Sequence, residues 1–307
     1  MDEWTYRIAA ALCDGVGPKT YNVLSRKVEA KGLAFADLFA LDETELIREF
    51  GVTASVAEKI VTAADGVEDV AAMREGLTEQ GIEILVSGMP GYPEKCAIWM
   101  EDSAPPLIYA MGPLDLLDAK GIGIVGSRDA SEAGLAAARA IGRRVAEEGA
   151  VVVSGFAAGI DTHGHLGALE AGGGTIACLP EGITQFRMRP ELAEVFENGS
   201  LLVLSQHPPR RPWSTGGAMS RNVVVCALSD AIVVAEAQLG GGTMHAAETA
   251  REMGKPVFTV ALDPLPDGNR SLIRTGAPAI DPTDPIDVTE LLAAHAMTPE
   301  GSQPSLF

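Results

Sequence analysis

Apolar runs of four or five residues recur through the middle of the chain and alternate with longer amphipathic stretches. The runs cover residues 122–125, 151–154, 175–179, 201–205, 231–235 and 257–260. The stretches between them cover residues 132–148, 161–171, 190–197, 220–229 and 243–253, and they have the length and apolar spacing of helices. Continuous Val and Ile runs separated by helices are typical of a buried parallel sheet. The pattern therefore predicts an α/β fold with a doubly wound, mostly parallel sheet.

The first 70 residues have a different pattern, which predicts a small all-helical domain. Short helices are expected over residues 5–12, 21–31, 42–50 and 56–64, and the turn Gly-Val-Gly-Pro-Lys-Thr at 15–20 is typical of a helix-hairpin-helix unit. This region has 13 acidic and 7 basic residues, which favours a structural or protein-contact role over DNA binding. We expect a helical domain over 1–70, an extended α/β core over 71–285 and a flexible tail over 286–307.

Three glycine-rich turns follow predicted strands and precede predicted helices. They are Gly126-Ser127-Arg128, the segment 154–161 and the segment 240–243. The carboxyl ends of parallel strands line one crevice, and helix N-termini at that crevice offer N–H groups to phosphate. The chain has neither the dinucleotide fingerprint nor the P-loop motif, so NAD binding and P-loop ATP hydrolysis are disfavoured. The turns predict a site for a nucleotide or a nucleic-acid backbone; the alternative is that the glycines only close tight turns.

Composition and charge limit the class of protein. The chain has 307 residues and a net charge of −19, which by itself opposes binding to nucleic acid. Residues 120–260, however, hold 12 Lys and Arg against 14 Asp and Glu, a net of −2, so most of the acidity lies in the flanks. The acidic start and the absence of an apolar run near the ~20 residues of a membrane span predict a cytosolic protein. Four scattered cysteines predict buried thiols and no metal site, and no cofactor is expected.

Several short motifs, in order along the chain, resemble the DNA-processing protein A family, also called Smf. They are Tyr92-Pro93, the segment 105–112, Gly126-Ser127-Arg128, Ser154-Gly155 with Gly159-Ile160-Asp161, His165 with 167–169, Pro208-Pro209, Arg211-Pro212-Trp213, Arg221-Asn222 and the segment 228–231. The resemblance spans residues 5–262. It implies a Rossmann-like core behind a small helical domain, binding of single-stranded DNA, delivery of that DNA to a RecA-type recombinase in recombination or natural transformation, and a homodimer.

The resemblance also implies a DNA-binding face. Arg128 and Arg221 are expected to supply guanidinium groups, which bind phosphate with two parallel hydrogen bonds. Backbone N–H groups are expected from the glycine-rich turns. The full set of expected binding residues is Gly126, Ser127, Arg128, Ser154, Gly155, Gly159, Arg211, Arg221, Asn222, Gly241, Gly242 and Thr243.

Three positions depart from the family pattern. Ala158, Gly240 and Val223 stand where the family often has a cation. The loss of each phosphate contact lowers the salt slope on single strands by about 0.7, so DNA binding is expected to be weak at physiological salt. The family has a winged-helix domain after the core, and we expect that domain to be absent from this protein.

With these cations missing, the pocket is also similar to that of cytokinin-activating phosphoribohydrolases. The segment 240–243 is close to that group's glycine-rich turn, but the first acid after it, Glu248, lies five residues on instead of two or three. Arg221 and Glu248 are the only catalytic pair that this alternative offers. We therefore expect a protein that is not an enzyme.

Two smaller predictions concern the second turn. His163 and His165 are two residues apart at a helix start, so they point to different faces and do not form a metal pair. His165 is expected to be a hydrogen-bonded structural residue, and Asp161 is expected to be a helix N-cap.

The C-terminal residues resemble the short peptides that dock on the bacterial sliding clamp. Gln303, Leu306 and Phe307 end the chain after a Thr-Pro-Glu-Gly-Ser stretch. Two apolar side chains at a free end suit an apolar pocket, and the glutamine suits its polar rim. The alternative is an ordinary tail that happens to end in two apolar residues.

Overall fold

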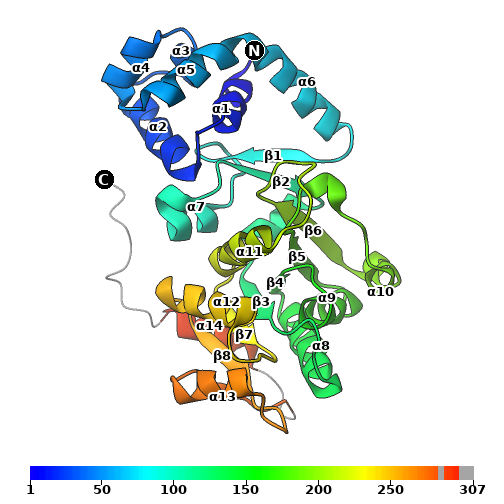
Figure 1. Cartoon of the computed structure of the whole chain (residues 1–307). Coiled ribbons are helices and arrows are strands. Elements are labelled where there is room, and N and C mark those ends of the chain that lie inside the picture. The colour runs from blue at the N-terminus through cyan, green and yellow to red at the C-terminus, as the bar shows by residue number, and fades with distance from the viewer. Residues whose placement is uncertain (283–286, 297–307) are drawn as a thin grey trace. The chain divides into compact units, whose positions relative to one another are not determined.

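The computed structural model of the chain describes residues 1–282 and 287–296 and divides it into two compact units, Met1–Ala110 and Met111–Phe307 (Figure 1). The first unit continues past residue 70, where the sequence places the end of the helical domain. The buried side chain of Asn22 ties later residues to the helices of this unit. It donates a hydrogen bond to Ala104 O (2.8 Å) and accepts one from Ser87 Oγ (2.9 Å). The three-part division of the chain into functional domains remains a prediction.

The first unit consists of short helices and one antiparallel pair of strands. Its elements are α1 (Glu3–Leu12), α2 (Pro18–Ala30), α3 (Phe35–Leu38), α4 (Glu43–Phe50), α5 (Ala54–Ala63), α6 (Val67–Thr78), β1 (Glu83–Val86), α7 (Glu94–Met100) and β2 (Leu107–Met111). Capping sets their limits: Asp42 accepts a hydrogen bond from Glu45 N (2.8 Å) at the start of α4, and Gly51 ends that helix in the left-handed conformation. The helices expected over residues 5–12, 21–31, 42–50 and 56–64 are present as α1, α2, α4 and α5.

The second unit contains a run of parallel strands in the order β6-β5-β4-β3-β7-β8-β9. The strands are β3 (Gly121–Val125), β4 (Val151–Ser154), β5 (Gly174–Cys178), β6 (Ser200–Ser205), β7 (Ala231–Val234), β8 (Val257–Val260) and β9 (Ala279–Ile280). The helices are α8 (Glu132–Glu147), α9 (Ile160–Glu170), α10 (Pro190–Ala193), α11 (Thr215–Leu228), α12 (Gly241–Glu252), α13 (Asp267–Arg274) and α14 (Val288–Ala296). The predicted doubly wound parallel sheet is confirmed. Strand order reverses at β3, and ligands of such sheets bind at that reversal.

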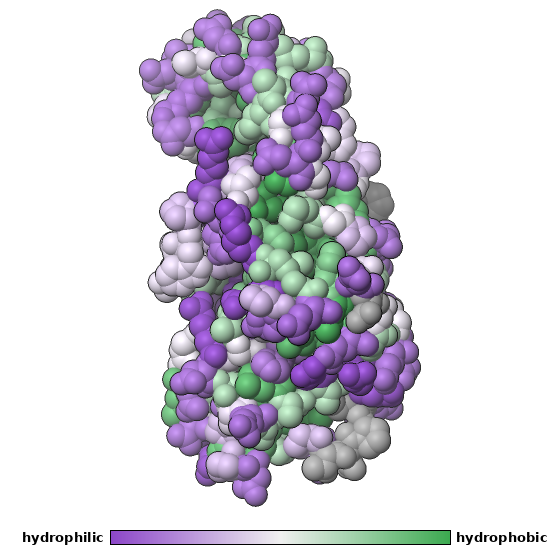
Figure 2. All heavy atoms as spheres, turned by 90° about the vertical axis from the view of Figure 1, so that its right-hand side faces the viewer, coloured by the Kyte–Doolittle hydropathy of each residue, from purple (hydrophilic) through white to green (hydrophobic). Residues whose placement is uncertain are grey.

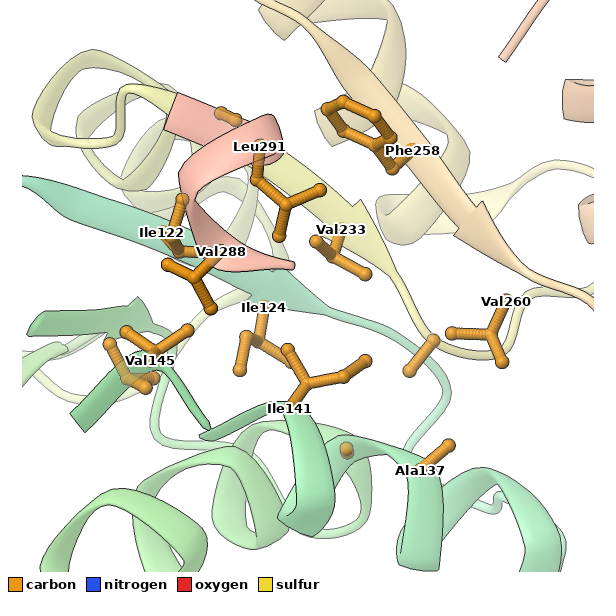
Figure 3. Close-up of a cluster of buried hydrophobic side chains, with 14 of the residues drawn as sticks. Ile122, Ile124, Ala137, Ile141, Val145, Val233, Phe258, Val260, Val288 and Leu291 are labelled. Carbon is orange, nitrogen blue, oxygen red and sulfur yellow. The ribbon is translucent and has the colours of Figure 1, made fainter. Parts of the chain in front are cut away.

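A buried apolar cluster joins the sheet to α8 and α14 (Figure 3). Ile122 and Ile124 of β3 and Ile141 of α8 are fully buried in it. Val288 and Leu291 of α14 lie three residues apart on one helix face and are 1% and 3% exposed. Residues 288–296, which were expected to belong to a flexible tail, therefore form a helix because its apolar face covers this cluster.

Two further differences from the sequence prediction affect the second unit. Helix α11 begins at Thr215, several residues before the predicted start, because Ser214 accepts a hydrogen bond from Gly217 N (3.0 Å). Helix α13 and strand β9 were not expected, because they lie in a segment rich in Pro and Asp, and these residues are typical of loops. Hydrophilic side chains cover much of the face shown in Figure 2, with smaller apolar groups between them. Within residues 1–282 and 287–296, no helix is long and apolar enough to span a membrane.

Candidate functional site

The first glycine-rich turn lies at the carboxyl end of β3, where the strand order reverses. Its backbone is held from both sides: Ser127 N donates to Glu236 O (2.8 Å), and Ser127 O accepts from Ile160 N (3.2 Å). The Arg128 side chain is exposed, and its guanidinium lies 5.6 Å from the centre of the Trp213 ring. Arg128 has no carboxylate partner among the residues that the structure describes. The turn thus presents an unpaired cation beside an aromatic ring.

The second turn approaches the first so closely that it needs glycine. Gly159 has a φ of +81°, and a Cβ there would lie 2.4 Å from Ser127 O. Gly159 is also the N-cap of α9, with no side chain closing the helix end. The N-cap role expected for Asp161 is therefore wrong, because Asp161 belongs to the first turn of the helix itself.

Asp161 instead pairs with Arg221 of α11 in the interior. Arg221 Nη1 and Asp161 Oδ2 are 3.5 Å apart, and the two side chains are only 6% and 8% exposed. Asp161 also accepts a hydrogen bond from Ala157 N (3.3 Å). A Cβ at Gly155 would lie 1.3 Å from Arg221 Nη1, so only glycine leaves room for the guanidinium. The second turn therefore orders a buried arginine next to the first turn.

The third turn is the start of α12. Gly240 is the N-cap and provides no side-chain hydrogen bond, so the first N–H groups of the helix have no side-chain cap. Asn222 of α11 donates to Gly242 O (3.1 Å) and so ties the turn to the helix that carries Arg221. The N-terminus of α12 therefore offers backbone N–H groups and a partial positive charge to an anion.

These turns surround a cavity of about 550 Å³, which we call the larger cavity. Of the expected binding residues, seven line it: Gly126, Ser127, Arg128, Arg221, Asn222, Gly242 and Thr243. An adjoining smaller cavity of about 260 Å³ shares Arg128, Ala157, Trp213 and Arg221 with it. Residues of all three turns thus line one cavity.

The other expected residues have different places. Ser154 is fully buried and donates to Ile124 O (2.5 Å), so its hydroxyl supports the sheet. Gly155 and Gly159 lack a side chain and so leave space for Arg221 and for the Ser127 carbonyl, respectively. Gly241 is exposed and next in sequence to the lining residue Gly242. Arg211 donates to His207 Nδ1 (2.9 Å) and to Ser214 Oγ (3.4 Å) and lines neither cavity.

The structure also brings in residues that sequence reasoning did not assign to the site. Arg189, before α10, and Glu181, after β5, line the smaller cavity together with Phe156. Arg189 Nη2 donates to Phe156 O (2.9 Å), and its guanidinium lies 5.2 Å from the centre of the Phe156 ring. Burial raises the pKa of the Glu181 carboxyl. In the sequence, Glu181 follows the apolar run 175–179 within two residues, and this position indicates the carboxyl end of a parallel strand, where ligands bind.

His165 has the structural role expected for it. Its Nε2 donates to Gly155 O (2.5 Å), and its Nδ1 lies 2.7 Å from Thr175 Oγ1. Complete burial lowers its pKa, so the imidazole is neutral near pH 7 and fixes the second turn. Nowhere in the described part of the chain do three His, Cys, Asp or Glu residues gather as they would to hold a metal ion.

The catalytic pair of the hydrolase alternative is not assembled. Arg221 lines the larger cavity, whereas Glu248 is an exposed residue of α12 and lines neither cavity. The carboxylate beside Arg221 is that of Asp161, which is already engaged with the guanidinium. The geometry gives the hydrolase alternative less support than the binding function.

Comparison with known proteins supports the resemblance found in the sequence. The family model described as DNA recombination-mediator protein A matches residues 64–292. Protein Smf of Synechocystis is 30% identical over 97% of this chain and 74% of its own length, and DNA processing protein DprA of Streptococcus pneumoniae is 36% identical over 57% of this chain and 63% of its own.

Solved structures agree with this result. The X-ray structure of DNA processing protein A from Streptococcus pneumoniae aligns with a TM-score of 0.75 and 26% identity, over 93% of this chain and 97% of that one. The structure of DNA processing protein A from Helicobacter pylori, which was determined to study its single-stranded DNA binding mode, aligns with a TM-score of 0.57 and 26% identity. The alignment covers 69% of this chain and 94% of that one. The chain therefore belongs to the DNA recombination-mediator protein A family.

Proposed function

We propose that this protein binds single-stranded DNA at the two cavities and delivers it to a RecA-type recombinase during recombination or natural transformation. The observation that carries the proposal is that Arg128, Arg189 and Arg221 line two adjoining cavities, and that the first turn of α12, which has no side-chain cap, lines the larger one. Guanidinium groups and free backbone N–H groups are the donors that a phosphodiester backbone prefers. In this proposal the protein acts by binding and not by catalysis.

Arg189 partly offsets the missing cations. Ala158, which replaces one family cation, lines the same smaller cavity as Arg189. Gly240 and Val223 line neither cavity. Carboxylates also line the cavities, but Asp161 is occupied by Arg221. The balance predicts DNA binding that is sensitive to salt.

The test is fluorescence anisotropy of a labelled oligothymidine at about 50 and about 200 mM salt. Three phosphate contacts give a slope of about −2 in log affinity against log salt, so affinity should fall roughly twentyfold over this range. Arg128→Ala should reduce the slope by about 0.7. Arg270→Ala is the matched control, because Arg270 is exposed on α13 and lines neither cavity.

Absence of binding at the lower salt would refute the proposal. Saturable binding of a mononucleotide that salt barely changes would instead favour the nucleotide-binding alternative. Delivery to a recombinase has its own test: the protein should shorten the lag of recombinase assembly on single-stranded DNA. An unchanged lag, with DNA binding intact, would limit the function to DNA binding.

Two further parts of the proposal concern partners. We propose a homodimer, which light scattering after size-exclusion chromatography tests directly. The clamp-binding peptide, Gln303, Leu306 and Phe307, lies outside the described residues. Deletion of these last residues should abolish binding to a sliding clamp, and unchanged binding would remove the idea. A role beside a recombinase implies a cytosolic protein.

A further inference from the structure

The smaller cavity has a different chemistry from the larger one. It is lined by aromatic side chains and by both acidic and basic groups, namely Phe156, Trp213, Glu181, Arg189 and Arg221. Its volume of about 260 Å³ lies below the ~300–1,000 Å³ typical of pockets that enclose a whole drug-sized ligand. A cavity of this size suits one planar group that enters from the larger cavity.

Unpaired polar atoms are concentrated at this cavity. In the described part of the chain, six buried side-chain nitrogen or oxygen atoms have no hydrogen-bond partner. Three of them belong to residues that line the smaller cavity: Glu181 Oε2, Arg189 Nε and Arg221 Nε. Unpaired buried polar atoms are costly and rare, so three around one cavity indicate that a ligand completes them. The ligand must donate to a carboxylate and accept from a guanidinium.

Guanine matches this pattern better than the other bases. Its Watson–Crick edge has two adjacent donors, N1–H and the N2 amino group, which one carboxylate accepts together. Its O6 and N7 are two acceptors that arginine recognises with two hydrogen bonds. Adenine presents an acceptor at N1, which a carboxylate repels, and thymine presents a single N–H between two carbonyls. Cytosine has a single donor group at N4 and therefore engages the carboxylate less completely.

The surroundings suit a base attached to a DNA strand. Trp213 is 52% exposed, so part of its ring is free to stack on a base, and stacking is a main source of single-strand affinity. Arg128 and Arg221 line both cavities, so a phosphate held in the larger cavity lies next to a base in the smaller one. Backbone hydrogen bonds fix the Glu181 segment, because Ser205 Oγ donates to Glu181 O (2.6 Å) and Gly182 N to Arg211 O (2.8 Å).

We propose that the smaller cavity is a guanine subsite, in which Glu181 accepts from N1–H and N2–H of the base and Arg189 donates to its O6 and N7. The inference rests on the proposed function, because it adds base preference to the same DNA-binding site. The preference is confined to one nucleotide of the bound strand, and the neighbouring nucleotides are bound through their phosphates.

The experiment compares short labelled oligothymidines in which one central position is dG, dA, dC, dT or deoxyinosine. The dG oligonucleotide should bind about tenfold more tightly than the all-dT one, which corresponds to about 1.4 kcal/mol. Deoxyinosine, which lacks the N2 amino group, should bind with intermediate affinity. Because this part changes only the ligand, it does not depend on the folding of a variant.

The protein variants are Glu181→Gln and the charge-matched control Glu191→Gln, which is exposed on α10 and lines neither cavity. Glu181→Gln should lower the ratio of dG to dT affinity to near one, and Glu191→Gln should leave the ratio at about ten. A wild-type protein that binds all five oligonucleotides equally, or a ratio that Glu181→Gln does not change, would overturn the inference.

Titration with free dGMP and dAMP separates failure of the inference from failure of the proposed function. If no oligonucleotide binds but dGMP binds selectively and Glu181→Gln removes this selectivity, the guanine subsite stands and the DNA-binding function fails. If oligonucleotides bind with salt dependence but without base preference, the function stands and the subsite fails. If neither oligonucleotides nor dGMP bind, both are refuted.

Discussion

Removal of the buried guanidinium of Arg221 tests the central arrangement of the site. Arg221→Met keeps a long side chain but leaves Asp161 inside the unit with a single hydrogen bond, from Ala157 N at 3.3 Å. Both members of the pair are more than nine-tenths buried, so solvent screens the lost interaction very little. Breaking a buried pair from one side costs about 3–5 kcal/mol. The 3.5 Å contact is longer than a strong charge-assisted bond, so we expect the lower end, about 3 kcal/mol.

The assay is urea denaturation followed by circular dichroism, with linear extrapolation to water. A loss of about 3 kcal/mol corresponds to a fall in melting temperature of roughly 6–12 °C for a unit of this size. The control is the double variant Arg221→Met with Asp161→Asn, which removes both charges. It should be more stable than Arg221→Met alone, because no unpaired charge remains buried.

Two results would refute this reasoning. A loss below about 1.5 kcal/mol for Arg221→Met would mean that the side chain contributes packing only, since volume-conserving apolar replacements cost that little. A double variant whose loss equals the sum of the single losses would mean that Arg221 and Asp161 do not interact.

Further predictions concern the second turn and its histidine. Gly155→Ala should lower the free energy of unfolding by about 1–3 kcal/mol and weaken oligothymidine binding, because the new Cβ overlaps Arg221 Nη1. The control is Gly216→Ala in α11, whose new Cβ meets nothing within 4 Å. In the same denaturation and anisotropy assays this control should be neutral or stabilising by up to about 1 kcal/mol. Equal effects of the two alanines would contradict the steric argument. Burial lowers the pKa of His165 below its usual 6.5, so the unfolded chain gains a proton at mildly acid pH that the folded one does not, and the free energy of unfolding should fall as pH falls below 6.5. His165→Gln should flatten that fall between about pH 7 and pH 5, leaving the part due to His207, whose pKa burial also lowers; a curve as steep as wild type would refute the assignment.

The periodicity of the sequence was enough to predict the architecture of the core. Runs such as residues 151–153 and 231–234 are buried on both faces of the sheet, so each position is apolar and the strand is evident without its neighbours. Some of the elements that were missed depend on interactions between distant residues. Helix α14, for example, exists where Val288 and Leu291 meet a cluster built by residues far earlier in the chain.

The sequence by itself also determined the three glycine-rich turns and the family, because backbone conformations and short motifs are local properties. It could not distinguish a buried arginine from an exposed one: Arg128 projects beside Trp213, whereas Arg221 is enclosed with Asp161. It did not place Glu181 and Arg189 at the site either. Both residues lie in the connection between β5 and β6. Only the tertiary structure brings that connection beside Arg221 of α11, where the unpaired atoms around the smaller cavity lie.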